Sequence, residues 1–335
     1  MVRRTMYWIL CLASGCLTLA AAQQRTPVAA PADVKPMSIT LEDVAYPHPV
    51  HYMPLTLYGH DVRMAYMDVP AANQPNGHTV VLLHGMNFYG EYWSGTIDVL
   101  RKEGFRVVVP DQVGFGRSTK AIIPYNLSDM AANTRKLLET LGLQKTMVVG
   151  HSMGGMVATR FGLLYPDVTE KLVLYNQIGL TDARLERPPA SVDATYKNLL
   201  NQSYDAVYQG IARYFPGGMK PEYERYVKIQ YGWSLSGNWP EAAMVRALAQ
   251  QMVYEDPVVY DWAHIKVPTM ELGGEKDGAN FPQLAKHVCD TIPKCELMLL
   301  PNLGHVPHFE APDVFYKALM KFLTPAERQA VGTAR

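Results

Sequence analysis

Thr-Met-Val-Val-Gly-His-Ser-Met-Gly-Gly, residues 146–155, is the stretch of sequence that decides the fold. An apolar run leads into a serine that stands between two glycines, and an apolar helical pattern follows. A sharp turn from strand to helix strains the backbone at Ser152, and side chains two residues away on either side would collide. The turn would hold the Ser152 hydroxyl above a sheet at a helix N-terminus, which favours an attacking oxygen and the oxyanion that follows. The stretch therefore predicts a serine nucleophile on a strand-turn-helix element.

Buried strands alternate with helices on both sides of this element. Continuous apolar runs predict strands at 79–83, 106–109, 146–149, 172–174, 267–272 and 296–300. Helical spacing predicts helices at 92–102, 128–141, 153–164 and 312–322. We expect Ser128 to cap the second of these helices. Strands that are buried on both faces and alternate with helices predict a doubly wound α/β fold with a mostly parallel sheet.

Two regions interrupt the alternation. Short strands over 54–58 and 61–68 flank Gly59-His60 and predict a hairpin. Residues 180–262 are largely helical in pattern and hold nine of the 20 tyrosines and three of the five tryptophans. We predict a helical lid over 180–262, inserted into a core formed by 53–179 and 263–325.

Trp233 and Trp239 lie within this predicted lid. Indole rings offer an apolar face and a polar N–H, which suits the wall of a pocket for a partly polar substrate. We therefore predict that both tryptophans bind substrate. The alternative is that these rings only pack the lid against the core.

A serine hydroxyl is too weakly acidic to attack unaided, so it needs a general base and a carboxylate that orients the base. His305, in the loop after the last predicted strand, is the candidate base. Asp277 follows the preceding strand and is the candidate carboxylate. Glu275 lies nearer that strand, and Asp182 is a rival by position. The chain thus offers a triad of Ser152, Asp277 and His305.

Catalysis at a serine also needs hydrogen-bond donors for the developing oxyanion. The backbone N–H of Met153, directly after the nucleophile, is one candidate. The backbone N–H of Met86 is the other, because it follows the strand at 79–83 and Gly85 permits a close approach. His84 and His151 stand at strand-loop junctions, and we expect them to be structural.

These motifs together resemble those of the α/β-hydrolase superfamily. The matching segments occur in the expected order, and they are His84-Gly85, 111–118, 150–154, 274–277, and Gly304-His305 with Glu310 and Pro312. The resemblance implies an eight-stranded, mostly parallel sheet with a helical lid inserted after the sixth strand. It also implies that 111–118 is a structural turn without a catalytic role.

The resemblance implies a serine hydrolase of carboxylic esters, with lactones and thioesters as related substrates and with no cofactor or metal. Ser152 excludes the members that use an aspartate nucleophile, which are dehalogenases and epoxide hydrolases. The run Met86-Asn87-Phe88-Tyr89 lacks the proline that perhydrolases often carry near the oxyanion loop. Hydrolysis of a carbon–carbon bond in a diketone remains an alternative, although asparagine often precedes the serine in those enzymes and His151 stands here. A non-catalytic binding protein on the same scaffold is the third possibility.

The charge balance limits the partners. Lysine and arginine number 31 and aspartate and glutamate number 31, so the formal net charge is zero. Nucleic-acid binders usually carry a basic patch, and charge alone would not hold this chain to an acidic membrane. We expect a small-molecule ester as the partner; the sequence does not predict the oligomeric state.

The first 22 residues differ from the rest of the chain. Arg3 and Arg4 precede an apolar run over 6–19, and alanines at 20–22 provide a cleavage site. These are the parts of a signal peptide, and the run is shorter than the ~20 residues of a membrane-spanning helix. We predict cleavage after Ala22 and export to the periplasm or the medium. The segment 13–16 also resembles a lipobox, so a lipoprotein anchored at Cys16 is the alternative.

Residues 23–52 are predicted to form a leader, and composition rich in alanine, proline and glutamine over 23–37 favours a flexible one. Cleavage would leave Cys289 and Cys295 as the remaining cysteines. A close pair in an oxidising compartment is a disulfide candidate, and two buried thiols are the alternative. A metal site is not expected, because no second pair completes a set of four ligands.

Overall fold

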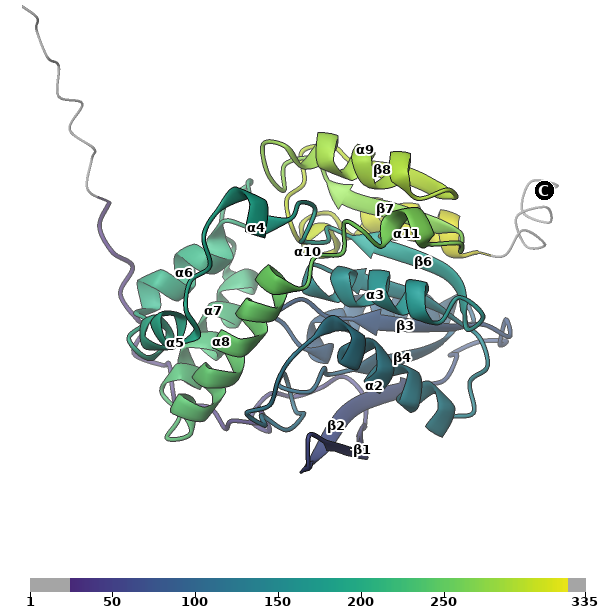
Figure 1. Ribbon diagram of the computed structural model, residues 1–335. Helices are drawn as coiled ribbons and strands as arrows, with labels where there is room; N and C mark the ends of the chain where they lie inside the picture. The colour runs from purple at the N-terminus through teal and green to yellow at the C-terminus, as the bar shows by residue number, and fades with distance from the viewer. Residues whose placement is uncertain (1–24, 325–335) are drawn as a thin grey trace, which may run out of the picture.

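The computed structural model describes residues 25–324, so the predicted signal peptide and its cleavage site lie outside the described residues. An eight-stranded sheet with the order β1-β2-β4-β3-β5-β6-β7-β8 forms its centre (Figure 1). The strands are β1 Val50–Leu57, β2 His60–Val69, β3 Thr79–Leu83, β4 Arg106–Pro110, β5 Thr146–His151, β6 Thr169–Tyr175, β7 Thr269–Gly274 and β8 Cys295–Leu300. β1 and β2 pair antiparallel, and every other neighbouring pair except β2–β4 is parallel. The predicted fold class is confirmed.

Two layers of helices cover the sheet because its central strands are apolar on both faces. Every residue of β3 and β5 is buried. One face packs against α1 (Ser94–Lys102) and α11 (Pro312–Leu323). The other face packs against α2 (Leu127–Thr140), α3 (Met153–Leu164) and α9 (Phe281–Thr291). The short helices that complete the core are η1 Gly90–Trp93, η2 Trp262–His264 and α10 Pro307–Glu310.

The predicted hairpin is present, but its turn comes one residue earlier than expected. His60 pairs with Leu57 in the antiparallel ladder, so it belongs to β2. Tyr58 and Gly59 form the turn, with φ values of 51° and 79°. Two successive residues with positive φ are typical of the tight turns whose twist matches that of the strands.

The predicted cap of α2 is wrong. Asn126 precedes the first helical residue in an extended conformation, and its side chain accepts a hydrogen bond from the backbone N–H of Asp129 at 2.8 Å. Ser128 lies inside the helix, and its hydroxyl accepts a hydrogen bond from Arg160 on α3 at 2.9 Å. The tertiary contact with Arg160 thus occupies the side chain that the sequence suggested as a cap.

Five α-helices stand between β6 and β7, and residues 180–262, which contain them, are called the insertion below. They are α4 Ala183–Glu186, α5 Val192–Leu200, α6 Tyr204–Ala212, α7 Pro221–Ser234 and α8 Trp239–Glu255. α5 to α8 form a group to one side of the sheet (Figure 1). No helix among residues 25–324 is both long enough and apolar enough to cross a membrane.

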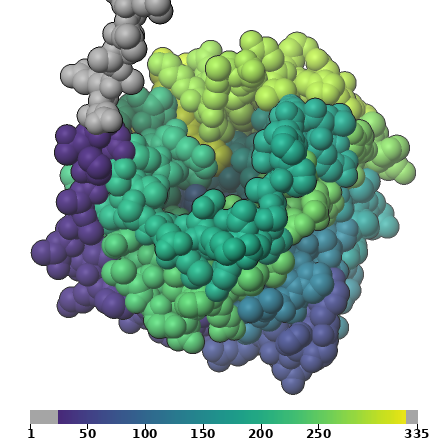
Figure 2. Space-filling model, turned by 60° about the vertical axis from the view of Figure 1, so that its left-hand side comes forward, coloured from purple at the N-terminus to yellow at the C-terminus, as the bar shows by residue number. Residues whose placement is uncertain are grey.

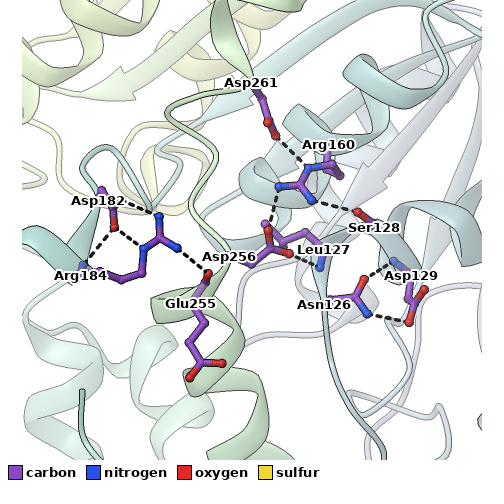
Figure 3. A network of polar contacts seen from close by, with 10 residues as sticks. All are labelled: Asn126, Leu127, Ser128, Asp129, Arg160, Asp182, Arg184, Glu255, Asp256 and Asp261. Carbon is purple, nitrogen blue, oxygen red and sulfur yellow. Dashed lines mark hydrogen bonds and ion pairs between the residues drawn. The ribbon is translucent and has the colours of Figure 1, made fainter. Parts of the chain in front are cut away.

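An arginine of the core fixes the point where the insertion returns to the sheet (Figure 3). Arg160 on α3 makes ion pairs of 2.8 Å with Asp256 and Asp261, which both follow α8. Asp256 also accepts a hydrogen bond from the backbone N–H of Leu127 at 2.8 Å, at the beginning of α2. The end of the insertion is therefore tied to the helix that begins next to Ser152.

The segment predicted as a flexible leader contacts the insertion. The backbone N–H of Val28 donates to Asp205 of α6 at 2.9 Å, and Asp33 pairs with Lys228 of α7 at 2.8 Å. Further along, the N–H of Met37 donates to the carbonyl of Gly232 at 3.0 Å. Residues 28–37 therefore run along the helices of the insertion, and β1 begins at Val50, inside the predicted leader.

The predicted disulfide is confirmed. Cys289 and Cys295 are bonded, with their Cα atoms 4.9 Å apart. The bond joins the last turn of α9 to the first residue of β8, as the spacing of the two cysteines suggested.

Candidate active site

Ser152 occupies the turn between β5 and α3 in a strained conformation. Its φ is 57° and its ψ is −120°, values that residues other than glycine rarely adopt. A Cβ atom at Gly150 would overlap the carbonyl of Gly154, and one at Gly154 would overlap the carbonyl of Leu83. Both glycines are therefore required by packing, for the reason that the sequence suggested.

The structure brings His305 and Asp277 into direct contact. Nδ1 of His305 lies 2.8 and 2.9 Å from the two carboxylate oxygens of Asp277, and the two side chains are 5% and 13% exposed. A ring N–H at Nδ1 that donates to the carboxylate leaves Nε2 to receive a proton from a serine. His305 and Asp277 both line a cavity of about 580 Å³ that also contains Ser152.

A residue that the sequence did not single out orients this carboxylate. The side-chain amide of Asn176, directly after β6, donates to Oδ2 of Asp277 at 2.8 Å. Its carbonyl oxygen accepts a hydrogen bond from the backbone N–H of Gly274 at 3.1 Å. Asn176 thus ties the loop that carries Asp277 to the end of β7. Its position directly after a buried strand was the signal for it in the sequence.

The rival carboxylate Asp182 has other partners. Its side chain pairs with Arg184 at 2.8 Å and accepts a hydrogen bond from the hydroxyl of Tyr260 at 2.9 Å. Figure 3 shows Asp182 and Arg184 side by side at the beginning of α4, within the insertion. These contacts indicate that Asp182 has a local structural role. The carboxylate that contacts His305 is that of Asp277.

His151 supports the loop of the candidate base. The side chain of His151 is fully buried. Burial is the main cause that lowers the pKa of His151 well below the usual range, and the neighbouring ring of His305 lowers it further. Nε2 of the neutral ring donates to the carbonyl of His305 at 2.8 Å, and the hydroxyl of Tyr92 donates to Nδ1 at 3.0 Å. The residue before the nucleophile therefore positions the backbone of His305.

His84 fixes the loop that follows β3. Its Nδ1 donates to the carbonyl of Gly85 at 2.9 Å, and its Nε2 accepts from the backbone N–H of Gln112 at 2.9 Å. Burial lowers the pKa of His84, which keeps the ring neutral in this arrangement. A Cβ atom at Gly85 would come within 2.9 Å of the Cβ of Ser152, so only glycine lets the loop lie this close to the nucleophile.

The two methionines proposed for the oxyanion hole both lie beside the serine. Met153 is the first residue of α3, so its N–H has no acceptor within the helix. Met86 follows Gly85 and lines the cavity that contains Ser152. Their positions are compatible with two N–H groups that converge on one oxygen.

Arg246 is a second residue that the sequence did not single out. It comes from α8, is only 4% exposed, and donates to the carbonyl of Met86 at 3.3 Å and to the side-chain carbonyl of Asn87 at 2.7 Å. Among residues 25–324 it has no carboxylate partner. Burial lowers its pKa to about 10, so the guanidinium still carries a charge at neutral pH. A lone arginine in the apolar run 242–249 was the available signal.

Tyr214 joins the same loop to the candidate base. The side-chain amide of Asn87 donates to the hydroxyl of Tyr214 at 2.7 Å. The ring of Tyr214 stacks on that of His305 with centroids 4.5 Å apart, and its carbonyl accepts from the backbone N–H of His305 at 2.9 Å. The insertion therefore contacts both the loop at Met86 and the loop at His305.

The structure does not bring Trp233 and Trp239, which were predicted to bind substrate, to the cavity of the candidate triad. They are 5% and 3% exposed, and neither lines the cavity that contains Ser152. Their indole N–H groups donate to the carbonyls of Ile39 at 3.0 Å and Leu199 at 3.2 Å. The rings pack with Leu41 in a separate apolar cluster, and these contacts favour a packing role for both tryptophans.

The cavity itself opens on the face seen in Figure 2, as a hollow between the teal and green atoms of the insertion and the yellow-green atoms of the later core. Its wall includes the apolar side chains of Leu180, Phe281 and Leu284. On the insertion side it is lined by Arg213 and Tyr214. A small molecule with an apolar part can therefore reach Ser152.

Comparisons with known proteins agree with this geometry. The family model described as "alpha/beta hydrolase fold" matches residues 78–312. "Putative carbamate hydrolase RutD" of Pantoea ananatis is 26% identical over 270 residues, which cover 80% of this chain and 96% of that protein. "Lipase 1" of Psychrobacter immobilis is 28% identical over 257 residues, 74% of this chain and 78% of the lipase.

A solved structure is more similar in sequence. The crystal structure of a "probable hydrolytic enzyme" from Pseudomonas aeruginosa PAO1 has 40% sequence identity and a TM-score of 0.84, and covers 87% of this chain and 99% of that one. A thermophilic esterase from Thermogutta terrifontis, at 24% identity and a TM-score of 0.66 over 82% of this chain and 98% of its own, shares the fold. With the family model matched over most of the chain, the protein belongs to the α/β-hydrolase family.

Proposed function

We propose that this protein is a serine hydrolase that cleaves carboxylic esters through an acyl-enzyme. The observation that carries the proposal is the contact between His305 and Asp277 in the same cavity as the strained Ser152. A nucleophile, a base and a carboxylate that orients the base are the three groups that acyl transfer to serine requires.

In the proposed mechanism, Oγ of Ser152 attacks the carbonyl carbon of the ester while Nε2 of His305 takes the hydroxyl proton. Asp277 holds Nδ1–H of His305 and stabilises the charged ring that forms. The tetrahedral intermediate collapses, the bond to the alcohol oxygen breaks, and His305 delivers the proton to the departing alcohol. Water then attacks the acyl-enzyme with His305 as base, which releases the acid and restores Ser152.

The oxyanion that forms in both steps would bind to the N–H groups of Met86 and Met153. The charge of Arg246 lies behind the carbonyl of Met86 and favours a negative charge at this position. Asn176 keeps Asp277 in place during the transfer of the proton.

The first experiment asks whether Ser152 is activated. A fluorophosphonate probe should label the wild-type protein at Ser152 and should fail to label the Ser152→Ala variant. Ser128→Ala is a matched control, since Ser128 contacts Arg160 away from the cavity, and labelling should persist in it. Absence of labelling in the folded wild-type protein would support a non-catalytic binding protein instead.

The second experiment identifies the bond that is cleaved. A panel of p-nitrophenyl esters, lactones, thioesters, an aryl carbamate and a vinylogous diketone would be offered to the purified protein. We expect the highest kcat/KM for carboxylic esters. Turnover of the diketone without turnover of esters would favour the carbon–carbon hydrolase, and the carbamate tests the activity named for a relative.

We further propose that the protein is exported. The basic and apolar segments within residues 1–22 motivate this proposal, and the bond between Cys289 and Cys295 fits an oxidising compartment. The intact mass of protein isolated from its source should correspond to a chain that begins at Gln23. A diacylglycerol-modified Cys16 would show that the protein is a lipoprotein, and an unprocessed chain would contradict export.

A further inference from the structure

A second cavity adjoins the one that contains Ser152. It has a volume of about 410 Å³ and shares Met86, Asn87, Ile178 and Arg213 with the cavity of the candidate triad. The shared residues include Met86, which belongs to the proposed oxyanion hole. A substrate whose carbonyl lies at Ser152 can therefore extend past Met86 into this second cavity, called the side chamber below.

The side chamber is positively charged. Arg187 and Arg213 line it, and within the described part of the chain its lining includes no aspartate or glutamate. Its other polar side chains are neutral and include Thr195, Gln250 and Tyr254. Arginine side chains without acidic neighbours in a concave site attract anions and raise their local concentration.

Both arginines have their donor groups available. Arg187 and Arg213 are exposed, and neither forms an ion pair with a carboxylate among residues 25–324. Arg187 lies over the ring of Tyr254 at 5.1 Å, and Arg213 over the ring of Tyr214 at 5.3 Å. Contact with an aromatic face restrains a guanidinium while its N–H edge stays free for a planar anion.

The nearby Arg184 shows the contrast. It stands only three residues before Arg187, yet it is fully engaged by the carboxylate of Asp182, with contacts of 2.8 and 2.9 Å. Buried Arg246 adds a further positive charge behind Met86 and Asn87. The positive charges of Arg187 and Arg213 at the side chamber therefore have no carboxylate partner within residues 25–324, whereas the charge of Arg184 is neutralised by Asp182.

We propose that the substrate ester carries a carboxylate, and that Arg213, together with Arg187, binds this group in the side chamber. The inference rests on the proposed ester hydrolysis and adds the chemical class of the substrate. The apolar wall at Leu180, Phe281 and Leu284 would contact the rest of the molecule. A guanidinium matches a carboxylate through two parallel hydrogen bonds, which gives both affinity and orientation.

The test compares substrates that differ only in charge. Monomethyl esters of the dicarboxylic acids from glutarate to suberate would be compared with neutral methyl esters of the same chain lengths. The wild-type protein should hydrolyse the anionic esters with a kcat/KM higher by about tenfold to a hundredfold, the effect of one charged hydrogen-bond pair. The preference should weaken as salt is added. Equal kcat/KM for both series, or a preference for the neutral one, would overturn the proposal.

Variants then locate the effect. Arg213→Gln should raise KM for the best anionic ester about tenfold with little change in kcat or in the kinetics of neutral esters. Arg213→Lys should retain part of the preference, because it keeps the charge. The matched control Arg184→Gln removes a neighbouring arginine that lies outside both cavities and should leave the preference unchanged. Loss of preference in Arg184→Gln, or its retention in the Arg187→Gln/Arg213→Gln double variant, would contradict the assignment.

A separate measurement distinguishes failure of this inference from failure of the proposed function. Glutarate should protect Ser152 from the fluorophosphonate probe at concentrations where the neutral glutaramide does not. If neither series of esters is hydrolysed, ester hydrolysis is refuted, and selective protection by glutarate would still establish an anion site. Equal protection by the two compounds would overturn the anion site itself.

Discussion

The core and the insertion contribute to the candidate site in different ways. Loops at the carboxyl ends of β5, β7 and β8 carry Ser152, Asp277 and His305, the groups proposed to react. The insertion carries Tyr214 and Arg246, which contact the loops of the site through hydrogen bonds and ring stacking. The groups proposed to react thus come from the ends of the sheet strands, and the insertion adds contacts to the loops that carry them.

This difference explains why the chemistry and the substrate can be assigned to separate parts of the chain. Functional residues at the ends of parallel strands are held by the ladder of the sheet, so their geometry depends on the fold itself. Residues of an insertion can change without loss of that ladder, which allows one fold to accept many substrates. The predictions below test this division, beginning with the largest expected effect.

Removal of a reacting group should have the largest effect. Ser152→Ala and His305→Ala should each lower kcat by about 10⁶, and Asp277→Asn by about 10⁴, as in dissected triads. Steady-state kinetics with the best ester of the panel would measure this. Asp182→Asn serves as the control, because Asp182 pairs with Arg184, and its kcat should match that of the wild type. A larger loss in Asp182→Asn than in Asp277→Asn would refute the assignment of the carboxylate.

Truncation of the buried tryptophans should affect stability and leave specificity intact. Trp239→Ala should lower the free energy of unfolding by about 3–5 kcal/mol, because a large ring leaves a cavity in a packed cluster. Trp233→Phe keeps an aromatic ring but loses the hydrogen bond to Ile39 and part of the ring volume, and it should cost less, about 1–2 kcal/mol. Urea unfolding measures both changes. A change in the ratio of kcat/KM among esters in folded Trp233→Phe would support the substrate-binding role that the sequence suggested.

Loss of Arg246 should slow the reaction through the loop that it holds. Arg246→Met should lower kcat about tenfold to a hundredfold with little change in KM, less than the 10²–10³ expected for a direct oxyanion donor. The rate of labelling by the fluorophosphonate should fall in parallel, and Arg246→Lys should recover part of both rates. Arg135→Met, which removes a surface arginine of α2, is the control. Unchanged kcat in a folded Arg246→Met variant would show that Arg246 has only a structural role.

A buried carboxyl group in the core should make stability depend on pH. Glu271 on β7 is fully buried, and its Oε2 accepts a hydrogen bond from Gln177 at 3.1 Å. Burial raises the pKa of Glu271 well above its usual range, so the folded protein holds this proton more tightly than the unfolded chain does. The contribution of this group to stability is therefore complete below the unfolded pKa and is lost as pH rises, by about 1.4 kcal/mol per pH unit at most.

Glu271→Gln removes this titration while keeping the size of the side chain. Relative to the wild type, the variant should gain stability progressively as pH rises above the unfolded glutamate pKa of about 4.3. Urea unfolding at several pH values would measure the difference in the free energy of unfolding. A difference that stays constant with pH would contradict the raised pKa of Glu271.

The sequence predicted the core well because the signals in the core are local. The apolar runs at 79–83 and 106–109 correspond to β3 and β4, since a strand buried on both faces must be apolar throughout. The glycines around Ser152 also act within a few residues of the turn that requires them. The candidate triad followed from positions after strands, and the structure brings His305 and Asp277 together at 2.8 Å.

The errors concern side chains whose partners are distant in sequence. The prediction that Ser128 caps α2 was wrong, because its hydroxyl accepts a hydrogen bond from Arg160 of another helix. Trp233 and Trp239 were expected at the substrate cavity and do not line it. The amino-acid composition of a helix contains no information about which of its faces lines a cavity. The bond of Trp233 to Ile39 spans 194 residues of the chain, and periodicity within α7 contains no information about it.

The sequence by itself determined the alternation of strands and helices, the turn at Ser152 and the cysteine pair, because each depends on residues close together along the chain. Only the tertiary structure decided which carboxylate contacts His305. It also decided that Arg246 donates to the carbonyl of Met86, 160 residues away in the chain, and that Arg187 and Arg213 line the side chamber together. Such contacts are fixed by the packing of whole helices against the sheet, a sum of many weak interactions that no local pattern encodes.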